Sequence, residues 1–335
     1  MSPASQKRVA KKSAAKKTTT KQHAAKKTTT KKSPAKKATT NKSAAMKATT
    51  KQRAEETAAV QALVVETPVE EVPVVEAPIE GEPVPSVHPN KAPNPILIAF
   101  EARAPLETVA GLFASPMLRG APTGDGHPVI VLPPFGAADQ FTAGMRRFLK
   151  QQGYTVFPWG HPEILGLHRL VQVAAERLGQ VREETGQRVS LIGHSLGGVY
   201  ARELARFAPQ NVRFVITLGS PISDLKANYV WPMFEATSGT RVASLPPEFA
   251  ERMGQAPPVP TTSIFSKTDG VVSWRSCLDR SSGQVENVEV SSSHIGLPSN
   301  PLALLVVADR LAQPADDWRP FQRSGIRRFF YRGRR

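Results

Sequence analysis

From about Pro95 onward, the chain alternates between short apolar runs and longer segments in which apolar residues recur every three or four positions. The short runs, rich in β-branched and aromatic residues, predict strands at 128–132, 155–159, 188–193, 213–218, 262–266 and 285–290. The periodic segments predict helices at 96–118, interrupted at Pro105, and at 139–152, 167–185, 197–207 and 301–313. Strands that alternate with helices in this way favour an α/β fold, in which a mostly parallel sheet carries helices on both faces.

The residues before Pro95 show no such periodicity. Residues 1–54 contain four copies of a ten-residue unit such as AAKKTTTKQH, with little larger than alanine to bury, so we predict a disordered arm. Residues 55–95 combine frequent proline with glutamate, which favours an extended linker. We therefore expect a basic repeat arm (1–54), an acidic linker (55–95), a folded domain (96–318) and a C-terminal tail rich in Arg and aromatic residues (319–335).

The formal net charge of +16 lies outside the predicted folded domain. Residues 1–54 carry 17 Lys or Arg and no acid, residues 55–90 carry eight Glu and no base, and residues 319–335 carry seven Arg. Residues 7–53 resemble in composition the tails of histone H1-like bacterial proteins, which implies that they bind DNA or another polyanion by releasing condensed counterions. A solvated tail that maintains solubility, or a linker folded back on the arm as a counter-charge, explains the same composition.

Cysteine content and the N-terminus indicate the compartment. The single cysteine, Cys277, excludes an internal disulfide, and the charged N-terminus is not followed by the apolar core of a signal peptide. Both features favour the cytoplasm, and the basic arm implies association with the nucleoid or with granules. The longest apolar runs fall far short of the roughly 20 residues that a membrane-spanning helix needs. No metal-ligand spacing links the histidines, so we expect no metal or organic cofactor.

The stretch RVSLIGHSLGGVYARELARF, at 188–207, joins an apolar strand to a helix through the pentapeptide GHSLG. Such a strand, sharp turn and helix form a nucleophile elbow, in which the serine has a strained backbone conformation. Gly193 and Gly197 would keep the crowded turn free of side chains, and Ser195 would lie at a helix N-terminus that favours developing negative charge. Ser195 is therefore the candidate nucleophile. The adjacent His194 is expected to pack within the elbow, with its side chain directed away from the serine.

A serine nucleophile needs a base, and the base needs a carboxylate that orients it. Asp269 lies in TDGVV, a turn directly after the strand at 262–266, and His294 lies in SSSHIGL, in the loop after the last predicted strand. His294 is the only histidine downstream of the GHSLG motif, and Asp269 ranks above the competing acids Asp224 and Asp279. Taken singly, Asp269 also fits an ordinary Asp–Gly turn, and His294 also fits an ordinary loop histidine.

The ordered motifs GHSLGG, TDGVV and HIGL resemble the lipase and esterase branch of the α/β-hydrolases over residues 120–313. The resemblance implies the α/β-hydrolase fold and a catalytic triad of Ser195, Asp269 and His294. It also implies an oxyanion hole made by the backbone N–H groups of Leu196 and Phe135. The PPFG loop departs from related enzymes, because Pro134 stands where they usually have glycine. An ordinary turn is the alternative interpretation of this loop.

Three further segments allow two interpretations each. Residues 223–258 lack clear periodicity; in α/β-hydrolases this region often forms a cap, which would favour an apolar ester, but burial against the core explains the same residues. Cys277 fits a small buried hydrophobe better than a reactive thiol. In the C-terminal tail, interleaved Arg and aromatic residues suit an anionic membrane surface or nucleic acid, and also suit packing onto the domain.

The sequence as a whole predicts a serine hydrolase of the lipase or esterase type, which cleaves a carboxylic ester through an acyl-enzyme on Ser195 and is localised by its basic arm. Transfer of the acyl group to an alcohol or thiol acceptor would use the same triad. The alternative from a different functional class is a nucleoid- or granule-associated binding protein whose hydrolase fold is mainly structural.

Overall fold

A computed structural model describes residues 91–113, 118–161, 167–239, 241, 249 and 252–331. The predicted disordered arm (1–54), nearly all of the predicted linker (55–95) and the last four residues lie outside this part of the chain. The interpretations of those segments therefore stay predictions.

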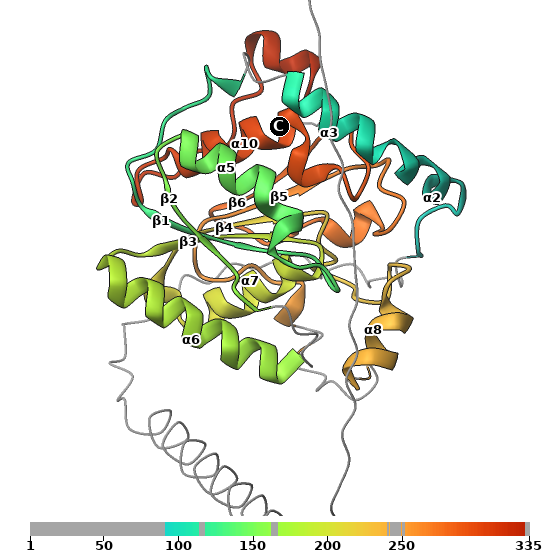
Figure 1. The fold of residues 1–335 in the computed structure, drawn as a ribbon, viewed down its shortest axis with the longest axis horizontal. Coiled ribbons are helices and arrows are strands. Elements are labelled where there is room, and N and C mark those ends of the chain that lie inside the picture. The colour runs from blue at the N-terminus through green and yellow to red at the C-terminus, as the bar shows by residue number, and fades with distance from the viewer. Residues whose placement is uncertain are drawn as a thin grey trace, which may run out of the picture. The chain divides into compact units, whose positions relative to one another are not determined.

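The described part of the chain is built around one sheet of six parallel strands. The strands are β1 (Pro128–Leu132), β2 (Thr155–Pro158), β3 (Val189–His194), β4 (Val212–Leu218), β5 (Thr261–Phe265) and β6 (Val285–Glu289). Each lies within one residue of its predicted bounds. Their order across the sheet is β2-β1-β3-β4-β5-β6 (Figure 1). The chain therefore changes direction of travel across the sheet between β1 and β3, and ligands of open α/β sheets bind at the carboxyl ends of strands at such a switch point.

Helices cover both faces of the sheet, as the alternating pattern predicts. One face carries α5 (Ala143–Gln151) and α10 (Pro301–Leu311), and the other carries α6 (Leu167–Thr185) and α7 (Leu196–Phe207) (Figure 1). Successive residues of β1 point to opposite faces: Val129 and Val131 pack with α5 and α10, whereas Ile130 packs with α6 and α7. Because both faces are covered, β1, β3 and β5 are buried along their whole lengths.

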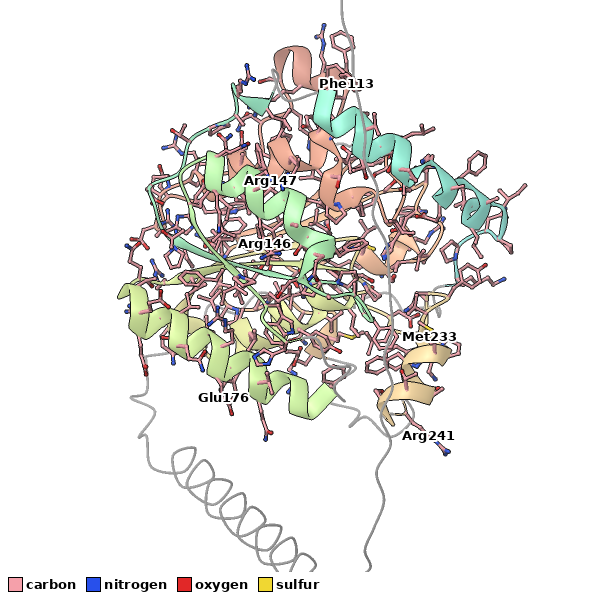
Figure 2. The ribbon with its side chains drawn as sticks, in the orientation of Figure 1. Phe113, Arg146, Arg147, Glu176, Met233 and Arg241 are labelled. Carbon is pink, nitrogen blue, oxygen red and sulfur yellow. The ribbon has the colours of Figure 1, made fainter. Side chains whose placement is uncertain are left out.

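Short helices occupy the connections between these elements. They are η2 (Asp139–Thr142), which precedes α5, then η3 (Pro209–Asn211), α8 (Trp231–Ser238), η5 (Trp274–Cys277) and η6 (Leu297–Ser299). A further short helix, η7 (Gly325–Phe329), lies in the C-terminal tail. In α8, which belongs to the predicted cap region, Trp231 and Phe234 join the hydrophobic cluster beneath α7, while Met233 is exposed (Figure 2). In the C-terminal tail, Phe321 and Tyr331 are buried against each other on the other face of the sheet.

The N-terminal strap, residues 96–113, departs most from the sequence-based expectation. It divides into α2 (Ile96–Phe100), η1 (Glu101–Arg103) and α3 (Ala104–Phe113). The predicted interruption at Pro105 is wrong in position, because proline is tolerated in the first turn of a helix and Pro105 lies in the first turn of α3. An amphipathic surface helix usually turns its apolar face to the core, yet Leu106 and Phe113 are 72% and 82% exposed while Glu101 is 8% exposed. Figure 2 shows Phe113 directed outward at the end of α3.

Candidate active site

Ser195 lies in the sharp turn between β3 and α7, at the carboxyl edge of the sheet. Its φ of 55° makes it the one non-glycine residue with a positive φ among the described residues. A serine persists in this strained region only when the surrounding structure enforces it. Part of that enforcement is a hydrogen bond from the Ser195 N–H to the carbonyl of Leu218, at 2.8 Å, which ties the turn to the end of β4.

Two glycines make this turn sterically feasible. A Cβ at Gly193 would lie 2.3 Å from the carbonyl oxygen of Gly197, and a Cβ at Gly197 would lie 2.5 Å from the carbonyl oxygen of Pro133. Both separations are far shorter than van der Waals contact, so only glycine fits. The second contact also places the start of α7 directly against the loop that follows β1. That loop contains Phe135, so the two N–H groups predicted for an oxyanion hole, on Leu196 and Phe135, belong to segments in direct contact.

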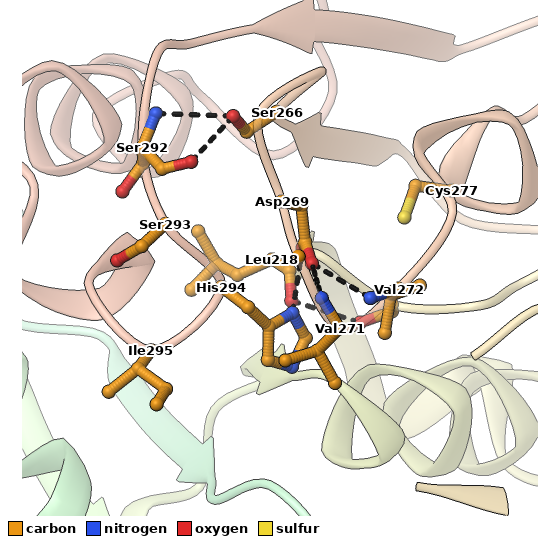
Figure 3. A network of polar contacts seen from close by, with 12 residues as sticks. Leu218, Ser266, Asp269, Val271, Val272, Cys277, Ser292, Ser293, His294 and Ile295 are labelled. Carbon is orange, nitrogen blue, oxygen red and sulfur yellow. Dashed lines mark hydrogen bonds and ion pairs between the residues drawn. The ribbon is translucent and has the colours of Figure 1, made fainter. Parts of the chain in front are cut away.

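Asp269 and His294 are joined at the same edge of the sheet, in the loops that follow β5 and β6 (Figure 3). The Asp269 Oδ2 atom lies 2.7 Å from His294 Nδ1, and both side chains are buried. The other carboxylate oxygen accepts the backbone N–H groups of Val271 and Val272, each at 2.8 Å. The carboxylate is therefore held by its own turn and is aimed at the imidazole.

The His294 ring has a defined tautomer and a perturbed pKa. Since a carboxylate only accepts, Nδ1 donates to Asp269, and Nε2 is left as the proton-accepting nitrogen. Burial by itself would lower the pKa of His294, but the charge and hydrogen bond of Asp269, together with the charge of Glu101, outweigh burial and raise this pKa above its usual value. An imidazole with these neighbours is a stronger base than a histidine in water.

His194 connects the elbow to the histidine loop. Its Nε2 donates to the carbonyl of His294 at 2.9 Å, and the two rings lie 4.8 Å apart between centroids. Burial, reinforced by the nearby His294, holds the pKa of His194 well below its usual value, so this ring is neutral. The predicted packing residue of the elbow thus also contacts the backbone of the candidate base.

Ser195 and His294 are connected indirectly, through His194 and through the end of β4. Within the part of the chain that the structure describes, the Ser195 hydroxyl makes no hydrogen bond to the His294 ring. Gly219 lies between the elbow and the Asp–His pair. It directly follows Leu218, whose carbonyl accepts the Ser195 N–H, and a Cβ on Gly219 would lie 3.1 Å from both Asp269 Oδ2 and His294 Nδ1. Catalytic hydrogen bonds of this kind are often long in free enzymes and shorten when substrate binds.

The competing acids lie elsewhere. Asp279 is buried in an ion pair with Arg202, with 2.5 Å between Oδ2 and Nη1. Asp224 accepts the backbone N–H of Lys226 in a turn. The Cys277 thiol is buried, and burial raises its pKa well above the usual value, which makes it a poor nucleophile.

Sequence reasoning missed two groups of residues around this site. Gly219 follows the apolar run of β4 and approaches the Asp–His pair, and a glycine at a strand end was the available signal. Glu101 and Glu107 of the strap bond the backbone of the histidine loop. No sequence signal marks them, because glutamates in a surface helix normally face solvent.

A second Ser–His–Asp chain lies at the opposite, amino edge of the sheet. His127 Nδ1 is 2.5 Å from Asp125 Oδ1, and His127 Nε2 is 2.9 Å from Ser190 Oγ. Ser190 lies within β3 and is 0% exposed. Neither His127 nor Ser190 was given a chemical role from the sequence, and a serine sealed inside the sheet has no access to a substrate.

The described residues contain no group of three or more His, Cys, Asp or Glu side chains arranged to bind a metal ion. None of the helices in the same part of the chain is long and apolar enough to span a membrane.

Comparison with solved structures finds distant likenesses. Lipase B from Aspergillus fumigatus is 18% identical over 59% of this chain, with a TM-score of 0.46, and the match spans only 58% of that lipase. A monoacylglycerol lipase from Paleococcus ferrophilus is 14% identical over 56% of this chain and 96% of its own, with a TM-score of 0.41. A thioesterase domain from the curacin biosynthetic pathway is 16% identical over 58% of this chain and 93% of its own, with a TM-score of 0.39. Likenesses this weak carry no information on substrate.

Comparison with families of sequences is more decisive. No curated protein sequence matches the chain. The family model described as the alpha/beta hydrolase family matches residues 129–333, which is more than half of the chain and includes the elbow, β2 to β6 and all of β1 except its first residue. The chain belongs to the alpha/beta hydrolase family.

Proposed function

We propose that this hydrolase cleaves a carboxylic ester through an acyl-enzyme on Ser195, with His294 as the base and Asp269 as the residue that orients it. One observation carries the proposal: a serine with a strained backbone lies at the same sheet edge as a buried Asp–His pair joined at 2.7 Å. A strained turn is maintained where function requires it, and an Asp–His pair of this geometry is the orienting half of a triad.

Acylation follows from the positions of these groups. The Ser195 oxygen attacks the carbonyl carbon of the ester while His294 Nε2 takes the hydroxyl proton, and the π electrons of the carbonyl move to its oxygen. The backbone N–H groups of Leu196 and Phe135 would bind this oxyanion, and one such donor contributes about 10²- to 10³-fold to kcat. Collapse of the intermediate re-forms the carbonyl and breaks the bond to the alcohol oxygen. His294 then delivers its proton to the departing alcohol.

Deacylation repeats the same steps with water. His294 Nε2 takes a proton from a water molecule as the water oxygen attacks the acyl carbon. The second tetrahedral intermediate expels the Ser195 oxygen, which recovers its proton from His294, and the carboxylic acid leaves. Through both halves Asp269 stays ionised, keeps Nδ1 protonated and stabilises the imidazolium that forms on each proton transfer.

The first test is covalent labelling of the nucleophile. We expect the wild-type chain to react with a fluorophosphonate and to hydrolyse p-nitrophenyl butyrate, and we expect Ser195→Ala to lose the label and to lower kcat by about 10⁶-fold. Product analysis with an added alcohol separates hydrolysis from acyl transfer.

Ser190→Ala provides the matched control for this experiment. Ser190 also bonds a histidine that bonds an aspartate, but it is buried within β3, so its removal should leave the label and the turnover in place. Labelling of Ser195→Ala at the wild-type rate would contradict the proposal.

We infer in addition that the basic arm binds DNA or another polyanion. The support is its composition, with 17 Lys or Arg and no acid in residues 1–54, since such charge releases counterions on binding. In a gel-shift titration with duplex DNA, the full chain should bind at low salt and release the DNA steeply as salt rises. Equal binding by a chain that begins at residue 91 would contradict a role for the arm.

A further inference from the structure

The N-terminal strap is attached to the domain in an unusual way. Its outer face carries exposed apolar side chains, including Ile96, Leu106 and Phe113. Among the strap residues whose burial the structure describes, Glu101 is the most deeply buried after Ala104. Burying a carboxylate costs several kcal/mol unless hydrogen bonds replace the lost water. The strap therefore does not lie on the domain through apolar burial alone, and the partners of Glu101 explain why it lies where it does.

The Glu101 carboxylate bridges the two loops that carry the candidate acid and base. Its Oε1 atom accepts the backbone N–H of Gly270 at 2.8 Å and the backbone N–H of His294 at 2.9 Å. Its Oε2 atom accepts the backbone N–H of Ile295 at 3.1 Å. Gly270 directly follows Asp269, so one side chain links the residue after the acid to the base itself.

Two neighbours of Glu101 in the strap, Arg103 and Glu107, make further hydrogen bonds to both loops. Glu107 accepts the N–H of Ser293 at 2.9 Å and its hydroxyl at 2.6 Å. Arg103 donates to the carbonyl of Thr268 at 3.0 Å and to Glu107 at 2.8 Å. The strap thus contacts the residue before the acid and the residue before the base, and an ion pair between Arg103 and Glu107 joins the two contacts.

The contact between the strap and these loops is direct at both ends. A Cβ at Gly270 would lie 2.2 Å from the carbonyl oxygen of Leu97, and a Cβ at Gly296 would meet Glu107 Oε2. No space for water remains between the strap and the loop backbones at these points. The strap and the two loops are therefore packed directly against each other.

We propose that Glu101 is a positioning residue, whose carboxylate holds the Asp269 and His294 loops at hydrogen-bonding distance from each other. Asp269 has additional support from the N–H groups of Val271 and Val272, but the backbone of Ser293, His294 and Ile295 donates to carboxylates of the strap at each residue. The inference rests on the proposed hydrolysis through Ser195. It also extends the catalytic unit beyond the residues that the family model matches, which begin at 129.

Charges around His294 give this role a second readout. The groups that face the ring are the Asp269 carboxylate, the Glu101 carboxylate and the neutral His194, and Glu107 lies one residue away along the loop. The negative charge of Glu101 favours the protonated ring. Its removal should therefore move the acid limb of the pH–rate profile to lower pH, which a purely structural contact would not do.

The test compares Glu101→Gln with Glu101→Asp. Glutamine keeps the length but loses the charge and one acceptor, whereas aspartate keeps the charge but is too short to reach all three N–H donors. Since a misplacement of about 1 Å costs about 100-fold in rate, we expect kcat for p-nitrophenyl butyrate to fall by about 10- to 100-fold in both variants, with KM changed by less than about twofold. The acid limb should move to lower pH in Glu101→Gln alone.

Glu203→Gln is the matched control for loss of a buried carboxylate. Glu203 is buried and paired with Arg206 and Arg252, and neither of these ion pairs involves the acid or the histidine loop. We expect this variant to lower Tm while keeping the wild-type kcat and acid limb.

If both Glu101 variants fold and keep the wild-type kcat, the inference is wrong. If only one of them folds, a wild-type kcat in that variant overturns it equally. The outcome is separable from the proposed function, because turnover that depends on Ser195 but not on Glu101 removes the positioning role and leaves the nucleophile in place.

Discussion

The two edges of the sheet each carry a serine, a histidine and an aspartate, and the two sets differ in how their members are connected. At the amino edge, Asp125, His127 and Ser190 are joined by continuous contacts of 2.5 and 2.9 Å. At the carboxyl edge Asp269 Oδ2 lies 2.7 Å from His294 Nδ1, and within the described residues the Ser195 hydroxyl makes no hydrogen bond to the His294 ring. Judged by hydrogen bonds alone, the amino-edge chain is the more complete.

The serine backbone distinguishes the two chains. Ser190 lies within the parallel strand β3, paired with Val129 on one side and Phe214 on the other, and its side chain is buried in the sheet. Ser195 has a φ of 55° beyond the end of the same strand, at a helix N-terminus. Five positions of sequence thus separate a buried hydroxyl within β3 from the candidate nucleophile just beyond its end.

The charges around the two histidines differ in the same sense. Burial lowers the pKa of His127, and the positive charge of Arg213, which pairs with Asp125 at 2.8 Å, lowers it further. Asp125 raises this pKa, but the net pKa stays below its usual value. His294 faces two carboxylates, and its pKa is raised. The pKa of His127 is thus lowered and that of His294 is raised, which fits the proposed role of His294 as the base.

Exchanging each aspartate for asparagine should break the comparison most clearly. Asp269→Asn removes the charge that orients His294 and stabilises its imidazolium, so kcat for p-nitrophenyl butyrate should fall by about 10⁴-fold. Asp125→Asn should leave kcat unchanged and lower the free energy of unfolding by about 1 kcal/mol, because its pair with Arg213 is partly exposed. Steady-state kinetics and urea denaturation measure the two effects. Equal losses of activity in both variants would mean that the amino-edge chain takes part in the reaction.

The pH dependence sharpens the comparison with a smaller effect. His294 must be neutral to take the serine proton, so kcat/KM should fall as pH drops through its pKa, and because that pKa is raised the midpoint should lie above about 6.5. Histidine NMR titration of the wild-type chain should show His127 changing charge at lower pH than His294. An acid limb that follows the titration of His127 would reverse the assignment of the base.

Much of the fold was predictable from local sequence. β1 (PVIVL) and β4 (VRFVITL) are mainly apolar runs, whereas β6 (VENVE) alternates apolar with polar residues. Both patterns are local, and the predicted bounds are right to within one residue. The elbow was equally local, because a strand, G-x-S-x-G and a helix occupy twenty consecutive residues. Because all six strands are parallel, the acid and histidine loops, which follow β5 and β6, lie at the same edge of the sheet as the elbow.

The strap was not predictable in the same way. Its periodic apolar residues indicated a helix, and helices form there, but the apolar face is turned outward and a glutamate inward. Glu101 meets its partners Gly270 and His294 across 169 and 193 positions of sequence. Periodicity shows which face of a helix is apolar. It does not show which hydrogen-bond donors of the domain lie beside the helix in the folded chain.

Sequence by itself determined the parallel sheet, the elbow and the residue types from which a hydrolase site can be built, because these depend on neighbours a few positions apart. Only the tertiary structure decided which aspartate meets His294, that His127 and Ser190 lie sealed at the other edge, and that a carboxylate from the N-terminal strap holds the histidine loop. Hydrogen bonds and charges act over a few ångströms of space, whatever the distance along the chain.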